Sequence, residues 1–413
     1  MSMFIPSFSF GAIAAAIGKS APSLVAIPDD NSVFNDEGDA TTGWTASNAT
    51  LSVASSYLRQ TKTGAGTSSS MSKGITFTST DRDFILYGKM RASSGTNHIG
   101  LMWLLNGSKE ISLWFGSAAA NTAYTAGAIS MCGTTGASTR HVLSIATGVD
   151  YTTTAVEFAL HFDKKFGSLA CYFKTAGKWL LKGRVACDWF SAAQIQVLNT
   201  SNTPATGWTE FDHLSLCRPN IMSIGDSICE GKNFYSPNLG LGLTDGTNSW
   251  QYNCPIYPAL RNTLIVNKGV GGQTSSQIHS RLAADVTNHS PRLVFLHAST
   301  NDEVGAISKA TRTANIQADI AAINGAGAQC VLLNAMYGTS GAPDNTPTPD
   351  LRDYMLDWWT NYRPSLAGLP LAIDITVPID SGGFANAAKV EADGLHPTAS
   401  GYADIGAHIE SFF

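Results

Sequence analysis

The sequence of 413 residues predicts two domains: an all-β sandwich or jelly roll, followed by an α/β/α domain whose sheet has five parallel strands. Three observations predict this division. Up to about Cys217 the chain reads as short strands separated by clusters of Gly, Ser, Thr and Asn. From Asn220 onward apolar strands alternate with amphipathic helices, which is typical of a parallel sheet covered on both faces. No linker rich in Ser, Pro or Gly separates the two patterns, so we expect the domains to pack closely.

The composition is that of an ordinary globular protein and argues against a nucleic-acid partner. Hydrophobic residues make up 44% of the chain, charged residues 14%, and the formal net charge is -5. The 26 basic residues do not cluster, and they are outnumbered by 31 acidic ones. No apolar run reaches the roughly 20 residues needed to span a bilayer, so we expect no membrane partner.

Residues 1–27 are expected to form an apolar arm. The apolar centre of this segment has no Lys or Arg before it, because the first basic residue is Lys19. A signal peptide carries its positive charge ahead of the apolar core, so this segment makes a poor one. We expect it to pack against another copy of the chain or within a virion-type assembly. The location stays open, with an extracellular or virion-associated protein favoured by the abundance of Ser, Thr and Gly.

The seven cysteines are odd in number, scattered, and never arranged as C-x-x-C. This pattern predicts buried free thiols in place of a disulfide framework or a zinc site. One or two disulfide bridges within the first half remain an alternative.

Residues 28–217 are predicted to form the sandwich. Within residues 155–163 apolar side chains alternate with Glu157, His161 and Asp163, which predicts a half-buried strand. In architecture the pattern resembles the lectin-type jelly rolls that accompany carbohydrate-active enzymes, and this implies binding of a glycan. Five tryptophans are either core residues or platforms for sugar rings: Trp103, Trp114, Trp179, Trp189 and Trp208. Strands are expected at 84–90, 98–105, 110–115, 141–146, 155–163, 168–174, 179–185, 194–198 and 208–216.

Residues 218–413 are predicted to form a flavodoxin-like domain of three layers. Parallel strands are expected at 221–225, 265–268, 293–298, 330–336 and 371–375. Helices are expected in a segment ending near residue 264 and at 275–288, 309–324, 350–362 and 399–412. In such a fold the ligand crevice lies at the carboxyl ends of the strands.

Four polar or glycine-rich segments should meet at this edge of the sheet. They are Gly225-Asp-Ser227, Gly269-Val-Gly-Gly272, Ser299-Thr-Asn-Asp302 and Asp393-Gly-Leu-His396-Pro397. A serine nucleophile needs a base to take its proton, and the base needs a partner that fixes its tautomer. His396 can serve Ser227 as this base, because Asp393 lies three residues away on a tight turn and can reach its Nδ1 atom.

Ester hydrolysis also needs hydrogen-bond donors for a developing oxyanion. The candidates are the backbone N–H groups of Ser227 and Gly272 and the side-chain amide of Asn301. Glycine at position 272 would let the backbone approach the reacting centre closely. This chemistry needs no metal and no cofactor.

In their order, these four segments resemble the blocks of the SGNH hydrolase superfamily, also called GDSL esterases and lipases. The resemblance covers about residues 219–413. It implies a serine esterase in which Ser227, Asp393 and His396 form the triad, and Ser227, Gly272 and Asn301 surround the oxyanion. Asp226 and Asp302 are expected to support the site, Asp226 by bracing the turn through backbone hydrogen bonds.

Two positions in these segments need comment. The third block of the superfamily usually reads Gly-x-Asn-Asp, and Ser299 replaces its glycine here. We expect some crowding beside Asn301, with the amide keeping its role. Cys229, two residues after the nucleophile, is expected to be a small buried residue and not a catalytic thiol.

The leading hypothesis is an esterase that removes O-acyl groups, above all O-acetyl groups, from a carbohydrate or polysaccharide. A lipid esterase or thioesterase is an alternative, disfavoured because no large apolar lid segment is evident. A second alternative is a phage or virion structural or receptor-binding protein that uses both domains for glycan attachment.

Overall fold

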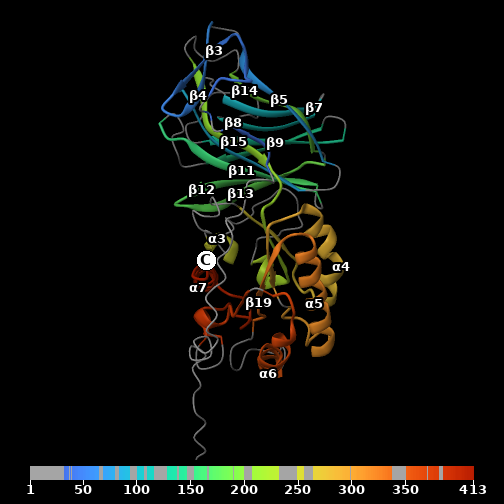
Figure 1. Ribbon diagram of the computed structural model, residues 1–413. Coiled ribbons are helices and arrows are strands. Elements are labelled where there is room, and N and C mark those ends of the chain that lie inside the picture. Colours follow the sequence, from blue (N-terminus) through green and yellow to red (C-terminus); the bar gives the residue numbers. More distant parts are fainter. Residues whose placement is uncertain are drawn as a thin grey trace, which may run out of the picture.

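The computed structural model describes residues 32–36, 38, 40–64, 68–79, 83–93, 100–106, 109–115, 128–136, 139–146, 153–164, 167–188, 190–199, 207–231, 249–254, 264–297, 299–336, 350–369, 371–380 and 385–413. The predicted arm of residues 1–27 lies outside them. Figure 1 shows a β-rich half stacked on an α/β half, with β11, β12 and β13 near the junction. None of the described helices combines the length and the hydropathy that crossing a membrane requires.

Two antiparallel sheets make up the first half. Across one sheet the strands run β13 (Lys178–Ala186), β12 (Ser168–Thr175), β11 (Val156–Asp163), β6 (Phe84–Ala92), β15 (Trp208–Cys217), β4 (Tyr57–Lys62) and β3 (Ala49–Ala54), and β1 (Ser32–Asp36) also pairs with β15. Across the other they run β10 (Thr139–Ala146), β9 (Ala128–Thr135), β8 (Lys109–Phe115), β7 (Gly100–Asn106), β14 (Phe190–Asn199), β5 (Ser69–Ser79) and β2 (Thr45–Ser47).

A shared apolar core makes these sheets a sandwich. Buried side chains of one sheet, such as Phe158 and Phe211, join Met131 and Ile195 of the other in a single cluster. All nine strands predicted in this half are present, with ends that differ by up to a few residues. The sequence analysis missed β1 to β5 and β9, which are short or rich in Ser and Thr and so carry little apolar alternation.

The second half contains the predicted sheet of five parallel strands. Their order is β17 (Ile265–Gly269), β16 (Ile221–Gly225), β18 (Leu293–His297), β19 (Gln329–Leu333) and β20 (Leu371–Ile373). Ladders between all neighbours are parallel. Nearly every residue of these strands is buried, which explains why they read as continuous apolar runs.

Helices cover both faces of this sheet. One layer contains α4 (Ser275–Asp285) and α5 (Lys309–Gly325), which pack on each other and on the sheet, as Figure 1 shows. The other layer contains α3 (Trp250–Asn253) and α7 (Ala399–Glu410), whose buried Trp250 and Tyr402 share a core with Phe295. The remaining short elements are α2 (Ser227–Glu230), η2 (Thr287–His289), α6 (Asp350–Asp357), η3 (Trp358–Tyr362), η4 (Arg363–Ser365) and η5 (Val377–Ile379).

The predicted helices agree with these elements, with two differences. The helix predicted to extend to residue 362 gives way after Asp357 to a π-helical turn, η3. The helix predicted to end near residue 264 corresponds to α3, which ends at Asn253, and residues 255–263 lie outside the described residues.

The two halves share a buried interface at the edge strand β17. Ile85 and Tyr172 of the sandwich belong to the same apolar cluster as Val266 of β17 and Ile278 of α4. The backbone N–H of Leu264 donates to the hydroxyl of Tyr87 at 3.0 Å. An edge strand that could pair with another chain is thereby covered within the molecule.

Strand β11 corrects one prediction, because it is not half-buried. All its side chains except that of Glu157 are buried. His161 and Asp163 lie on the face opposite the sandwich core, and this face is covered by the α/β half, where Lys268 approaches Asp163. Period-two alternation showed which side chains share a face, but the polar face turned out to bind another part of the protein instead of water.

All seven cysteines are free and buried, as predicted. The alternative of disulfide bridges in the first half is therefore wrong.

Candidate active site

The candidate nucleophile, Ser227, lies where β16 ends and α2 begins. Asp226 is the N-cap residue of α2 and accepts a hydrogen bond from the backbone N–H of Ile228 at 3.0 Å. The chain therefore passes from a buried strand to a helix within two residues. This abrupt turn presents Ser227 at the carboxyl edge of the sheet.

Asp226 is completely buried beneath this turn. Its Oδ2 accepts from the backbone N–H of Thr300 at 2.6 Å, and its Oδ1 lies 3.2 Å from Nδ1 of His297. Burial alone would raise the pKa of Asp226, but His297 and the two backbone donors outweigh it and leave the pKa below its ordinary value. Asp226 therefore ties the first block to the third. The imidazole of His297 faces the same carboxylate.

The imidazole of His396 lies between Ser227 and Asp393. Its Nε2 is 2.8 Å from Oγ of Ser227, and its Nδ1 is 2.8 Å from Oδ2 of Asp393. The other carboxylate oxygen of Asp393 accepts from the backbone N–H groups of Leu395 and His396. These bonds fix the carboxylate on the turn and orient the ring, so that Nε2 can accept the serine proton.

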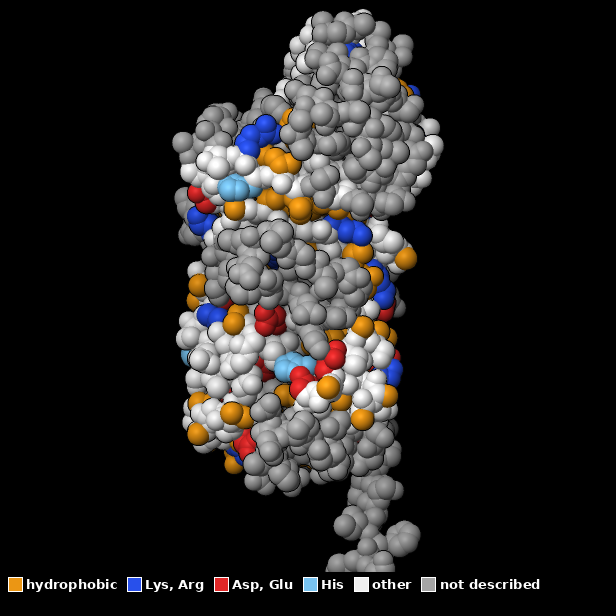
Figure 2. All heavy atoms as spheres, turned by 180° about the vertical axis from the view of Figure 1, so that it is seen from behind, with side chains coloured by type: hydrophobic (Ala, Val, Ile, Leu, Met, Phe, Trp, Pro, Cys, Tyr) orange, Lys and Arg blue, Asp and Glu red, His pale blue; other side chains and the backbone are white. Residues whose placement is uncertain are grey.

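The environment keeps Asp393 ionised at neutral pH. Burial by itself would raise its pKa, but the two backbone N–H groups and the His396 side chain lower it by more, so the pKa lies below its ordinary value. The side chains of His396 and Asp393 are 29% and 43% exposed. In Figure 2 acidic side chains gather around a surface histidine on the α/β half.

Gly272 lies on the loop after β17 and has a φ of +76°. A Cβ atom added there would meet no atom within 4 Å. The left-handed backbone, and not crowding, is therefore what requires glycine at this position.

The amide of Asn301 faces the same loop. Its Nδ2 donates to the carbonyl of Gln273 at 3.1 Å. An amide nitrogen carries two N–H groups, so this bond leaves a second donor for a substrate oxygen.

Ser299 uses its hydroxyl to connect the second and third blocks. Its Oγ donates to the carbonyl of Gln273 at 2.7 Å and accepts from the backbone N–H of Asn301 at 3.2 Å. The side chain is accommodated in a buried position, and Ser299 is not among the described residues with positive φ. The crowding expected from replacing glycine is absent, because the hydroxyl forms hydrogen bonds with both neighbouring segments.

Asp302 supports the start of α4. Its Oδ1 accepts from the backbone N–H of Ser275 at 2.7 Å, and its Oδ2 lies 3.3 Å from Nε of the buried Arg312. Burial raises the pKa of Asp302, and Arg312 opposes this shift. The carboxylate therefore anchors the helix that follows the Gly272 loop.

Two further residues that the sequence analysis did not single out hold the site together. Glu230 accepts from the backbone N–H of Gly271 at 2.6 Å through Oε2. Arg281 donates to the carbonyls of Gly225 and Lys268 at 2.7 and 2.6 Å, at the ends of two adjacent strands. The sequence could have pointed to Glu230 as a site residue, because it lies only three residues after Ser227. No local pattern marks Arg281.

Cys229 is unsuited to nucleophilic chemistry. Burial raises the pKa of its thiol to about 12, so the thiolate form is scarce at neutral pH.

The tryptophans of the sandwich differ in their surroundings. Trp114 is buried, and Trp179 packs against Tyr87 at a centroid distance of 5.6 Å. The guanidinium of Arg59 lies 4.4 Å from the Trp208 ring centroid, so it occupies one face of that ring. The side chains of Trp103 and Trp189 lie outside the described ones.

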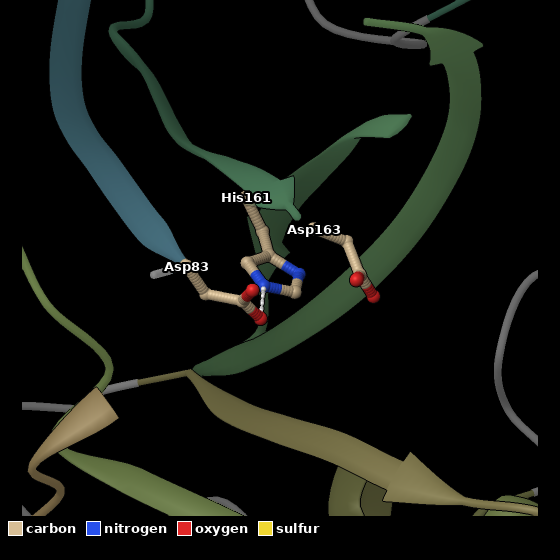
Figure 3. Close-up of side chains that lie close together, drawn as sticks. All are labelled: Asp83, His161 and Asp163. Carbon is tan, nitrogen blue, oxygen red and sulfur yellow. Dashed lines mark hydrogen bonds and ion pairs between the residues drawn. The ribbon is translucent and has the colours of Figure 1, made fainter. Parts of the chain in front are cut away.

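Three clustered side chains, Asp83, His161 and Asp163, resemble a metal-binding set (Figure 3). Nε2 of His161 is 3.0 Å from Oδ2 of Asp83. However, Nζ of Lys268 lies 2.6 Å from the same Asp83 oxygen and 3.1 Å from Oδ1 of Asp163. The ammonium group therefore occupies the place where a cation would sit, and the cluster is a buried ion network between the two halves.

The model of the GDSL-like lipase/acylhydrolase family matches residues 223–403. No curated protein is similar enough in sequence to match the chain.

Several solved structures resemble parts of the chain. A GDSL-like lipase from Bacteroides thetaiotaomicron VPI-5482 is 21% identical, with 46% of this chain and 85% of that one covered and a TM-score of 0.34. A catalytic mutant of an acetylxylan esterase from Geobacillus stearothermophilus is 18% identical, with 46% and 92% covered and a TM-score of 0.38. A Bacillus licheniformis beta-glucanase is 11% identical, with 45% and 97% covered and a TM-score of 0.34.

Proposed function

We propose that residues 223–403, which match the model of the GDSL-like lipase/acylhydrolase family, form an esterase domain that removes O-acetyl groups from a carbohydrate through an acyl-enzyme on Ser227. The observation that carries the proposal is the hydrogen-bonded series in which His396 lies 2.8 Å from both Ser227 and Asp393. A hydroxyl, an imidazole and a carboxylate in this order are the parts that serine acyl transfer requires.

In the first half-reaction Oγ of Ser227 attacks the ester carbonyl while Nε2 of His396 takes the hydroxyl proton. The ionised Asp393 accepts the Nδ1–H group and stabilises the imidazolium. The negative oxygen of the tetrahedral intermediate accepts hydrogen bonds from the N–H groups of Ser227 and Gly272 and from Asn301. Each such donor typically contributes about 3 kcal/mol to the transition state.

Collapse of the intermediate releases the sugar alcohol, which takes the proton from His396. The ring is then neutral again and removes a proton from water, which attacks the acyl-enzyme. When the second tetrahedral intermediate collapses, the bond between the acyl carbon and Oγ of Ser227 breaks, Oγ takes the proton back from His396, and acetic acid leaves and ionises to acetate. Every proton passes through one nitrogen of His396, and no metal or cofactor enters the cycle.

The carbohydrate part of the proposal is supported by the organisation of the chain. The sandwich is packed against the edge of the catalytic sheet through a buried interface that includes Tyr87 and Lys268. A module that packs on the catalytic domain in this way can hold part of a long substrate while another part reaches Ser227.

The test of the chemistry is pre-steady-state hydrolysis of a chromogenic acetate ester by the full chain. We expect a burst of chromophore from the wild type and none from Ser227→Ala. Ser280→Ala, which removes an exposed serine of α4, is the matched control and should keep the burst. Equal hydrolysis by Ser227→Ala would refute the proposed nucleophile.

The substrate class needs a separate comparison. We expect acetate release from an acetylated polysaccharide to exceed hydrolysis of a long-chain acyl ester and of an acetyl thioester, compared by kcat/KM. Faster turnover of the long-chain ester or of the thioester would favour the lipid esterase or thioesterase alternative.

A further inference from the structure

His297 is a buried polar residue at the point where the parallel sheet meets the candidate active site. It is the last residue of β18, and the four residues before it in the strand are apolar. Its side chain is 0% exposed. A polar ring removed from water needs a partner within the protein. The group that His297 faces therefore indicates what the residue does.

The His297 ring lies beside the turn that carries the nucleophile. A Cβ atom added to Gly225 would come within 2.5 Å of His297 Cβ, so glycine at this position allows the close approach. Nδ1 of the ring is 3.2 Å from Oδ1 of Asp226. Neither ring nitrogen has a well-aligned hydrogen bond within the described chain. The attraction between the ring and Asp226 is therefore mainly electrostatic.

This attraction requires a proton on Nδ1 of His297. An unprotonated Nδ1 would direct its lone pair at an oxygen of an ionised carboxylate, which also offers only lone pairs. Two such acceptors 3.2 Å apart would repel each other. With its proton, Nδ1 instead presents positive potential to Asp226, whether the ring is neutral or fully charged. The ring thus favours the ionised form of this carboxylate.

The carboxylate of Asp226 holds two segments that carry candidate catalytic groups. Its Oδ1 accepts from the backbone N–H of Ile228, the residue after Ser227. Its Oδ2 accepts from the backbone N–H of Thr300, the residue before Asn301. An ionised carboxylate can accept both bonds, whereas a protonated carboxyl turns one oxygen into a donor. The positions of the nucleophile and of Asn301 therefore depend on the charge of Asp226.

The other charges around Asp226 are less able to keep it ionised. Burial by itself favours its neutral form. Further described groups that interact with it are Asp302, Glu230, Cys229, Tyr402 and Arg312. Arg312 is the one cation among these five, and its Nε lies 3.3 Å from Asp302. Arg281 also reaches the turn, where it donates to a carbonyl of β16. His297 is thus the group best placed to hold the charge of Asp226.

We propose that His297 is a positioning residue for ester hydrolysis, which keeps Asp226 ionised and thereby fixes the geometry of Ser227 and Asn301. The inference rests on the proposed function, because it assigns a role in that reaction. Being completely buried, His297 touches no substrate and acts through Asp226. Its loss should lower kcat with little change in KM, since the groups that it aligns act in the transition state.

The test is steady-state hydrolysis of a chromogenic acetate by the full chain over a range of pH. His297→Phe keeps a ring but has no N–H group, and it should lower kcat by about 10²-fold. His297→Asn places an amide N–H group near the position of Nδ1 and should lose about tenfold or less. In both variants burial of Asp226 is less opposed, so the acid limb of kcat should move to higher pH.

His279→Phe is the matched control, because it removes an imidazole from another buried carboxylate. Nδ1 of His279 lies 2.6 Å from Oδ1 of Asp319, between α4 and α5. This variant should keep the wild-type kcat and acid limb. In a chain that carries Asp226→Asn the carboxyl is absent, so the His297 substitutions should move the acid limb much less.

Two results would refute the positioning role of His297. One is a wild-type kcat and pH profile in both His297 variants, and the other is an equal shift of the acid limb with and without Asp226→Asn. His297→Asn keeps a polar side chain and gives the answer if the Phe variant folds poorly.

The pair is also tested without a substrate, by urea unfolding of His297→Asn, Asp226→Asn and the double variant. We expect the double variant to lose less stability than the sum of the single losses, because each single change already removes the interaction. Additive losses would refute the interaction. A wild type that hydrolyses no ester would instead refute the proposed function, so the two failures are seen in different measurements.

Discussion

The ammonium group of Lys268 lies 2.6 Å from the carboxylate of Asp83, and the two residues belong to different halves of the protein. Both side chains are almost completely buried. Lys268 is the residue before Gly269, where the loop that carries Gly272 begins. One ion pair therefore joins the sandwich to the strand that positions a candidate oxyanion donor.

Lys268→Met should destabilise the protein strongly, because Asp83 and Asp163 would keep their buried charges without the ammonium group. We expect the free energy of unfolding to fall by about 3–5 kcal/mol near neutral pH. Lys309→Met breaks a partly exposed pair with Asp357 and should change the free energy of unfolding little. Urea titrations monitored by circular dichroism give both values.

The pH dependence of this loss follows from Asp83. Burial would raise its pKa, but Lys268, His161 and His289 lower it by more, and it lies below its ordinary value. In the wild type the contribution of Asp83 is complete above the unfolded-state pKa of about 4 and is lost as the pH falls through the folded-state pKa. In Lys268→Met the ammonium group no longer opposes the effect of burial on Asp83. Protonation of Asp83 then removes an unfavourable buried charge, so the variant becomes less destabilised as the pH falls. The difference from the wild type should narrow between about pH 7 and pH 4; a constant difference would contradict this account.

Asp393→Asn should lower kcat/KM for a chromogenic acetate by about 10²–10⁴-fold, because an amide no longer fixes the Nδ1–H tautomer of His396. Glu391→Gln changes a carboxyl on the same loop, where the Glu391 backbone N–H donates to the His396 carbonyl, and should keep most of the activity. Steady-state kinetics at several pH values compare the two variants. Similar losses in both would mean that the loop, and not the carboxylate, matters.

Glu230→Gln should separate the charge of this residue from its hydrogen bond. The amide oxygen can still accept from the Gly271 N–H group, so kcat at the pH optimum should change little. The variant removes a negative charge that interacts with the His396 side chain, so the acid limb of kcat/KM should move to lower pH.

Glu230→Ala also removes the hydrogen bond and should lower kcat by up to about 10²-fold, since the Gly272 loop would no longer be held in position. Burial raises the pKa of Glu230, so part of it is neutral in mildly acidic solution, and the profiles should be measured down to that range. If the wild type, Glu230→Gln and Glu230→Ala had identical pH profiles of kcat and kcat/KM, Glu230 would have no role in positioning the Gly272 loop.

Ser299→Gly restores the residue that the superfamily usually has at this position and removes the hydroxyl that binds Gln273 and Asn301. We expect about 1 kcal/mol less stability and a lower kcat with little change in KM, because the affected groups surround the oxyanion. Ser299→Ala lacks the same hydroxyl and should show the same losses of stability and kcat as Ser299→Gly. A fully active glycine variant beside an impaired alanine variant would instead point to a steric requirement. Thermal unfolding and steady-state kinetics provide the two readouts.

Local patterns were sufficient to predict much of the fold. The five parallel strands of the second half are buried on both faces, so each appears in the sequence as an apolar run without help from its neighbours. The same reasoning predicted which segments meet at the carboxyl edge of the sheet. The structure brings Ser227, His396 and Asp393 together there.

The sequence by itself determined the order of the five parallel strands and of the main helices in the second half, and the polar segments at the ends of these strands, because periodicity and turn residues are local properties. Only the tertiary structure decided what the polar face of β11 contacts, that Lys268 fills the space between Asp83 and Asp163, and that His297 pairs with Asp226. Such partners lie far apart in the sequence. Burial makes them pair, since a charge removed from water needs a counter-charge nearby, but no local pattern records where that counter-charge will come from.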